Sequence, residues 1–119
     1  MATRELEVAV RERAGATILD LVGDIDAAAD RALQRAYDAA AGGGSVVLNF
    51  SRTEYINSTG IALIVGLLAQ ARARGAHITA CGLSEHYREI FEITRLADFM
   101  TIADTETGAL GGAEGGHHA

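Results

Sequence analysis

The segment from Tyr55 to Gly66 constrains the fold most, because a helix that is apolar on almost every side follows a strand-to-helix junction. Two adjacent hydroxyls, Ser58 and Thr59, lie at this junction. The apolar residues after Gly60 are expected to pack on a sheet. The start of a helix also offers free backbone N–H groups and the positive end of the helix dipole, which tolerate negative charge. This position suits a modifiable switch better than a catalytic group.

Strands and helices alternate along the rest of the chain. Strands are expected at residues 6–10, 16–22, 46–50, 77–81 and 99–103. Helices are expected from about 27 to 40, from 58 to 74 and from 84 to 93, and residues 51–55 form a polar connector. Asp26 is expected to cap the first helix and Ser84 to start the third, while Gly42-Gly43-Gly44 should end the first and Gly75 the second. The short link at 11–15 predicts a β-hairpin. The fold class is therefore α/β, with a mixed sheet of about five strands that opens with an antiparallel hairpin and carries three to four helices.

A chain of 119 residues, 49% of them hydrophobic, is expected to form one domain over residues 1–104. Residues 105–119 are expected to hold a partial last helix, which Asp104 would cap, and a Gly-rich tail. Because Gly disfavours helix, the tail is expected to be disordered.

Charge and cysteine content exclude several function classes. A formal net charge of −6 argues against nucleic acid and anionic membrane surfaces as partners. Cys81 is the only cysteine, so no disulfide forms within the chain, and a cytoplasmic location is the simplest inference. The apolar stretch at 61–69 is too short to span a membrane. No cluster predicts a catalytic site, a metal site or a cofactor, and we expect a binding module rather than an enzyme.

Helical periodicity divides residues 58–74 into two faces. The face expected against the sheet holds Ile61, Ile64, Val65 and Leu68. The opposite face, expected to bind a partner, holds Thr59, Leu63, Gly66 and Gln70. Because Thr59 shares its face with Leu63, Thr59 is a stronger candidate for modification than Ser58. The alternative left open is that both hydroxyls only cap the helix.

Four short motifs, in this order, resemble those of one known family. They are Gly23-Asp24-Ile25-Asp26, Val46 to Phe50, Asn57-Ser58-Thr59-Gly60-Ile61 and Ile93 to Phe99. Their order and spacing resemble a STAS domain of the anti-sigma-factor antagonist type, over residues 6–103. The resemblance departs from the family at the switch, where Asn57 stands in place of Asp and Thr59 in place of Ser.

The resemblance implies that an anti-sigma factor, which is also a serine/threonine kinase, phosphorylates the second hydroxyl, Thr59, with Ser58 as the alternative. Phosphorylation would break the complex between antagonist and anti-sigma factor. Residues expected to flank the switch are Asp24, Asp26, Asn57, as the helix cap, and Gly60. A phosphatase and a second copy of the chain are further candidate partners. Two other roles within the family stay open: a scaffold subunit of a stress-signalling assembly, and an accessory subunit of a lipid transporter.

Overall fold

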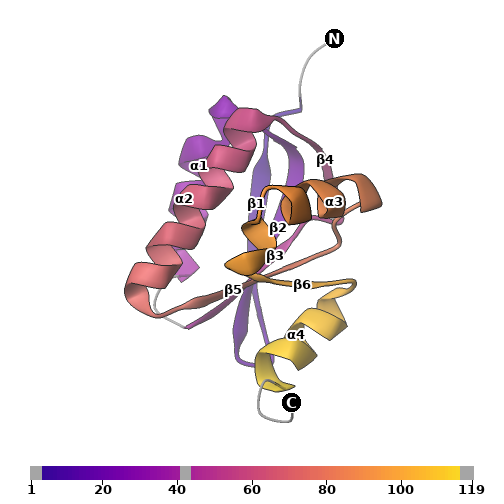
Figure 1. Cartoon of the computed structure of the whole chain (residues 1–119). Coiled ribbons are helices and arrows are strands. Elements are labelled where there is room, and N and C mark those ends of the chain that lie inside the picture. The colour runs from indigo at the N-terminus through magenta and orange to yellow at the C-terminus, as the bar shows by residue number, and fades with distance from the viewer. Residues whose placement is uncertain (1–3, 41–43, 116–119) are drawn as a thin grey trace.

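The computed structural model describes residues 4–40 and 44–115. A mixed sheet lies between helices (Figure 1). Its strands are β1 (Glu7–Arg13), β2 (Ala16–Ile25), β3 (Ser45–Asn49), β4 (Thr53–Ile56), β5 (His77–Cys81) and β6 (Thr101–Ala103). The helices are α1 (Asp30–Ala40), α2 (Ser58–Arg74), α3 (Glu85–Ile93) and α4 (Glu106–Gly115), with short 3-10 turns η1 (Ala27–Ala29) and η2 (Leu96–Asp98).

The strand order is β1-β2-β3-β5-β6, and β4 pairs with the end of β2. β1 and β2 are antiparallel, whereas the other pairs are parallel. The expected α/β fold with an opening hairpin is therefore confirmed, with six strands in place of about five.

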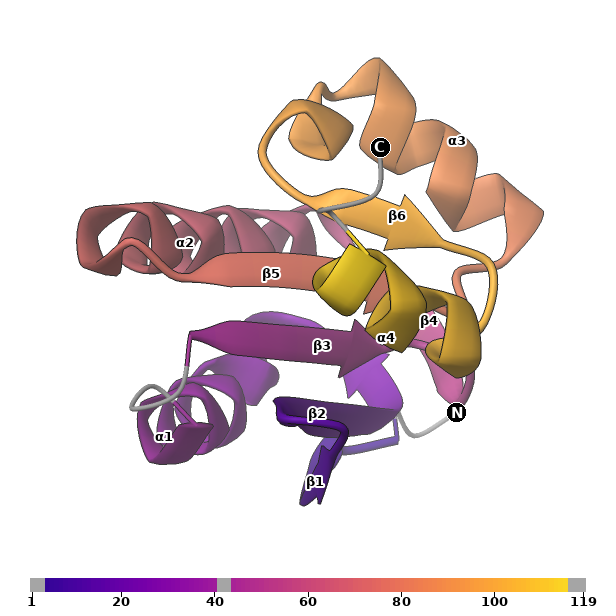
Figure 2. The same cartoon turned by 90° about the horizontal axis from the view of Figure 1, so that it is seen from below.

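Two apolar clusters hold the layers together. The larger one joins α1, α2 and α3 to one face of the sheet, around fully buried residues such as Tyr37, Ile64 and Phe91. The smaller one joins Ala109 and Leu110 of α4 to the opposite face. The helices α1 and α2 contact each other, and Figure 2 shows α4 apart from both.

Most expected elements are found close to their expected ends. Asp26 caps the turn η1, which leads into α1, and Ser84 caps α3. Gly75 ends α2 in the left-handed conformation, at φ 70°. Of the glycines expected to stop α1, Gly42 and Gly43 lie outside the described residues, and Gly44 has a positive φ of 107°.

The polar connector expected at 51–55 is wrong in part, because Thr53–Ile56 forms strand β4. Long-range contacts hold this strand. The hydroxyl of Thr53 donates to the carbonyl of Leu21 at 2.8 Å, and the N–H of Ile56 donates to the Tyr87 hydroxyl at 2.9 Å. Such contacts leave no local pattern in the sequence.

The end of the chain also differs from expectation. The last strand begins at Thr101, because Leu96–Asp98 forms the turn η2. The helix α4 is formed despite its glycines, and Thr105, not Asp104, accepts the N–H of Gly108 at 3.0 Å. Residues 116–119, in the tail expected to be disordered, lie outside the described residues.

Candidate functional site

Asn57 caps α2, as expected. Its backbone is extended, and its side-chain Oδ1 accepts the N–H of Gly60 at 2.8 Å. Its carbonyl accepts the N–H of Ile61 at 2.9 Å. An amide oxygen makes this cap as well as a carboxylate does. The change from Asp to Asn at this position therefore removes a charge and keeps the geometry of the helix start.

The start of α2 packs closely against the end of β2. Ile56 pairs with Ile25, and the N–H of Asn57 donates to the carbonyl of Ile25 at 3.2 Å. A Cβ added at Gly60 would lie 2.0 Å from that same carbonyl oxygen. Only glycine fits this contact, so Gly60 fixes the first turn of α2 on the sheet.

Ser58 and Thr59 form the first turn of α2, and both are exposed. Within residues 4–40 and 44–115, neither of their backbone N–H groups has a hydrogen-bond partner. These N–H groups and the positive end of the helix dipole favour an anion at this point. The hydroxyls are thus accessible to solvent, and the helix start favours negative charge.

The two aspartates expected beside the switch have different surroundings. Asp26 directly follows Ile25 at the end of β2, where the switch also lies, and its carboxylate accepts the N–H of Ala28 at 3.0 Å. Asp24 is buried, and its carboxylate accepts the N–H of Arg4 at 3.0 Å. Asp26 therefore follows the end of β2 that pairs with Ile56, just before α2, whereas Asp24 holds the N-terminal segment.

The expected division of α2 into two faces is wrong in part. Val65, expected in the core, is 46% exposed. Leu63, expected to be exposed, is half-buried and packs against the core cluster. Gln70 is held by Gln34 of α1 through two reciprocal side-chain hydrogen bonds of 2.8 and 2.9 Å. The helix is apolar all round, so periodicity alone did not identify the buried side.

A continuous exposed line of residues runs along α2 from the switch. Spaced alternately by four and three residues, they share one side of the helix. They are Ser58, Ala62, Val65, Ala69 and Arg72, all exposed, and we call them the α2 strip. Gly66 lies beside this strip, half-buried, with open space where a Cβ would stand. The strip is smooth and apolar between its two polar ends.

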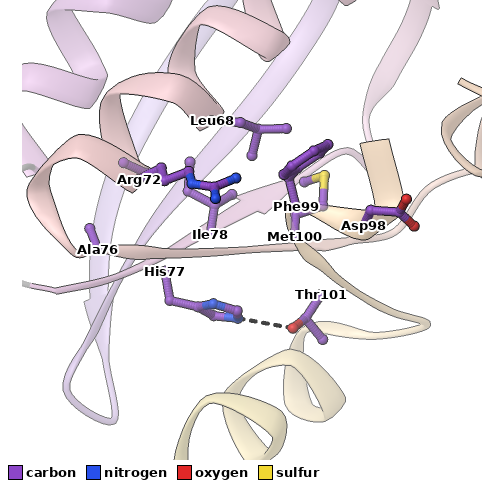
Figure 3. A pocket seen from close by; sticks show the side chains of 10 residues that line it. Leu68, Arg72, Ala76, His77, Ile78, Asp98, Phe99, Met100 and Thr101 are labelled. Atoms are coloured by element: carbon purple, nitrogen blue, oxygen red, sulfur yellow. Dashed lines mark hydrogen bonds between the residues drawn. The ribbon is translucent and has the colours of Figure 1, made fainter. Parts of the chain in front are cut away.

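The far half of the strip borders an apolar groove of about 310 Å³. Across the groove from α2 lies the segment 94–99, whose Phe99 is 57% exposed. The guanidinium of Arg72 lies 5.7 Å from the centre of the Phe99 ring. Figure 3 shows Arg72 directed toward Phe99, with Leu68 nearby. Sequence patterns do not predict this groove, because they place Phe99 in a strand.

A second hollow, of about 350 Å³, shares Leu68, Arg72 and Phe99 with this groove. There the ring Nε2 of His77 and the hydroxyl of Thr101 share a hydrogen bond of 2.9 Å (Figure 3). This hydrogen bond joins the starts of the neighbouring strands β5 and β6, so His77 has a structural role.

Ion pairs attach α4 to the hairpin at the opposite face of the sheet. Glu106 accepts from Arg11 at 2.6 Å and from Arg13 at 2.8 Å, and Arg11 also binds Asp20 at 2.6 Å. These hydrogen bonds hold the pKa of Glu106 and the pKa of Asp20 below their usual values. This cluster is accounted for by the docking of α4.

Cys81 lies beneath α4 and is buried. Desolvation, with smaller contributions from the carboxylates of Glu106 and Asp20, raises the pKa of its thiol to about 11. Because the thiolate is the reactive form, this cysteine is a packed core residue rather than a reactive one.

Comparison with known proteins identifies the family. The family model described as "Mlab, STAS domain" matches residues 8–102. The anti-sigma-B factor antagonist of Listeria monocytogenes is 32% identical over 88 residues, which cover 72% of this chain and 77% of that protein. The chain belongs to the STAS domain family, within the group of anti-sigma-factor antagonists.

Solved structures share the fold. An anti-sigma factor antagonist from Mycobacterium paratuberculosis is similar with a TM-score of 0.80 at 19% identity, covering 92% of this chain and 95% of that one. The Bacillus cell fate determinant SpoIIAA in its phosphorylated form is similar with a TM-score of 0.66 at 21% identity, covering 87% and 96%. Among the described residues, no helix is long and apolar enough to cross a membrane.

Proposed function

We propose that this chain is an anti-sigma-factor antagonist that binds an anti-sigma factor with serine/threonine kinase activity and releases it when the switch is phosphorylated. Its relatives' names support the antagonist role, and the phosphorylated form of SpoIIAA supports control by phosphate. One observation carries the proposal. Two exposed hydroxyls stand at an anion-tolerant helix start, at one end of an apolar exposed strip.

Different observations favour Thr59 and Ser58 as the phosphate acceptor. The resemblance implies that Thr59 is the acceptor. Thr59 is also expected to share an exposed helix face with Leu63. Leu63 instead packs against the core, so a shared exposed face with Leu63 no longer favours Thr59. Ser58 stands at the head of the α2 strip, one turn before Ala62. We therefore favour Ser58 as the acceptor on geometry, with Thr59 as the alternative.

The α2 strip and its groove form the proposed docking surface. Val65 and Phe99 are large, exposed apolar side chains on the two sides of the groove. Exposed apolar residues that gather in one place are typical of protein interaction sites. Of the residues that the sequence predicts to bind a partner, Leu63 and Gln70 contact other parts of the chain and are left out of this surface. Gly66 stays at its margin.

Phosphate at the switch would act on the complex rather than on the fold. It carries a charge of about −1.5 to −2 at neutral pH, which the start of α2 accommodates. In the complex this charge would be desolvated beside an apolar strip, and Asp26 lies at the same end of the sheet. A cost of about 3 to 4 kcal/mol corresponds to a hundred- to thousandfold loss of affinity.

Phosphate mapping tests the proposal. The chain, Ser58→Ala and Thr59→Ala are each incubated with a candidate anti-sigma kinase and ATP, and the product is mapped by mass spectrometry. We expect phosphate on the wild type and on Thr59→Ala, and none on Ser58→Ala. Phosphate on Ser58→Ala alone would assign the site to Thr59. Wild-type chain that binds the kinase and stays unmodified contradicts the switch.

A further inference from the structure

The first strand, β1, has an open edge. It is the outermost strand of the sheet, and among the residues that the structure describes it pairs only with β2 (Figure 2). An open edge presents unpaired backbone N–H and C=O groups, which form a template for another strand. Val10, in the middle of β1, is 47% exposed. The edge therefore offers an incoming strand both backbone partners and an apolar side chain.

The turn after β1 determines which residues direct backbone groups to this edge. Ala14 and Gly15 alone join β1 to β2, and both have positive φ, at 53° and 81°. Such a two-residue turn closes on a hydrogen-bonded pair, and bonded and non-bonded pairs then alternate along the hairpin. The residues that direct their N–H and C=O away from β2 are therefore Val8, Val10 and Glu12.

The sequence of β1 is complementary to itself in antiparallel orientation. If Val10 faces Val10 of a second copy, all seven residues of β1 are paired. Glu7 then faces Arg13 at both ends, and Val8 faces Glu12. Opposite charges that face each other across strands are stabilising. Charged side chains usually keep edge strands apart. On β1 their order instead favours pairing with a second copy.

We propose that two copies of this chain associate by antiparallel pairing of their β1 strands, centred on Val10, into one continuous sheet. Other registers are less favourable. A shift by two residues in one direction places Arg11 opposite Arg11, which is repulsive. A shift in the other direction pairs only residues 7–11. The register centred on Val10 keeps the whole strand paired and both charge pairs matched.

This association leaves the switch accessible. β1 pairs with β2 up to Val22, whereas β4 pairs with Gly23–Ile25 of β2, beyond that point. Ser58 and Thr59 follow β4 at that end of the molecule. Each dimer would therefore carry two exposed switches and two docking surfaces.

Sedimentation equilibrium of the whole chain tests the pairing. As its concentration rises, the wild type is expected to pass from the 12.4 kDa monomer to twice that mass, since a single strand pair is a small interface. Val10→Lys places two cations at the axis and is expected to raise the dissociation constant at least about tenfold. The matched control is Val65→Lys, at an equally exposed valine on α2, which is expected to leave the dimer unchanged.

Charge reversal tests the register. Glu7→Arg places like charges opposite each other and weakens the dimer, whereas the double variant with Arg13→Glu restores it. Because Arg13 also binds Glu106, the single variant Arg13→Glu is measured beside them to show what the loss of that ion pair does. Circular dichroism verifies that each variant is folded. Failure of the double variant to recover the dimer contradicts the proposed register.

Oxidative cross-linking tests the axis directly. Val10→Cys brings two thiols face to face and is expected to give a disulfide-linked dimer, whereas Ala9→Cys is not, because its copies are offset along the strands. Cys81 is buried and does not compete. A wild type that stays a monomer at every concentration, or a dimer that Val10→Lys leaves intact, overturns the proposal.

Discussion

The side-chain oxygen of Asn57 accepts the backbone N–H of Gly60 at 2.8 Å, while Gly60 itself touches the end of β2. The two residues thus fix the first turn of α2 from both sides. The hydroxyls of Ser58 and Thr59 lie between them and remain exposed. The two hydroxyls proposed as the switch therefore stand on a helix start whose backbone is fixed by Asn57 and by Gly60.

Removing the cap should destabilise the fold. Asn57→Ala loses the hydrogen bond to Gly60, and we expect the free energy of unfolding to fall by about 1 kcal/mol. Asn57→Asp keeps an acceptor and adds a charge that the helix dipole favours, so its stability should match the wild type within about 0.5 kcal/mol. Urea denaturation measures both. A loss for Asn57→Asp as large as that for Asn57→Ala would contradict the cap.

Two glycines in α2 should respond in opposite ways to the same substitution. Gly60→Ala places a Cβ 2.0 Å from the Ile25 carbonyl oxygen, and we expect a loss of about 3 kcal/mol or more. Gly66→Ala meets nothing within 4 Å and should gain up to about 1 kcal/mol from helix propensity. Thermal or urea unfolding compares the pair. Similar effects at both positions would refute the close approach at Gly60.

Binding and stability should separate at two neighbouring residues of α2. Val65→Lys places a charge on the α2 strip, so we expect at least about tenfold weaker binding of the anti-sigma factor, with stability changed by less than about 0.5 kcal/mol. Leu63→Ala removes a residue packed against the core and should cost about 2 kcal/mol of stability. Calorimetric titration and urea unfolding measure the two effects. If Leu63→Ala weakened binding and Val65→Lys lowered stability instead, Leu63 rather than Val65 would belong to the docking surface.

Acid should loosen the attachment of α4. Hydrogen bonds from Arg11 and Arg13 lower the pKa of Glu106, so its ionised form stabilises the fold. This contribution is complete above the ordinary pKa of glutamate, about 4.3, and is lost as the pH falls from there through the lowered pKa of Glu106. Glu106→Gln should therefore show a shallower loss of stability over this range. Glu92→Gln, at an exposed site, is the control and should keep the wild-type slope.

Local signals predicted much of the fold. The cap at Asn57, the stop at Gly75 and the cap at Ser84 each depend on residues within one turn of the helix end, so the sequence alone places them. Strand β4 could not be predicted, because contacts with Leu21 and Tyr87, distant in sequence, hold it.

The orientation of α2 could not be derived from the sequence. This helix carries apolar residues on almost every side. Which side is buried therefore depends on how α1 and the sheet pack against it. Gln70 binds Gln34 of α1, whereas Val65 of the same helix is exposed. The helix α4 forms for a similar reason: Ala109 and Leu110 are buried and Glu106 is paired, and these tertiary contacts outweigh the helix-disfavouring glycines.

Phosphate at the proposed switch is expected to prevent docking of the anti-sigma factor. The most direct test is the affinity of the phosphorylated and unmodified chains for the same anti-sigma factor, measured by isothermal titration calorimetry. We predict a hundred- to thousandfold weaker affinity after phosphorylation, about 3 to 4 kcal/mol, with both forms equally folded by circular dichroism. Equal affinity of the two folded forms would contradict the account.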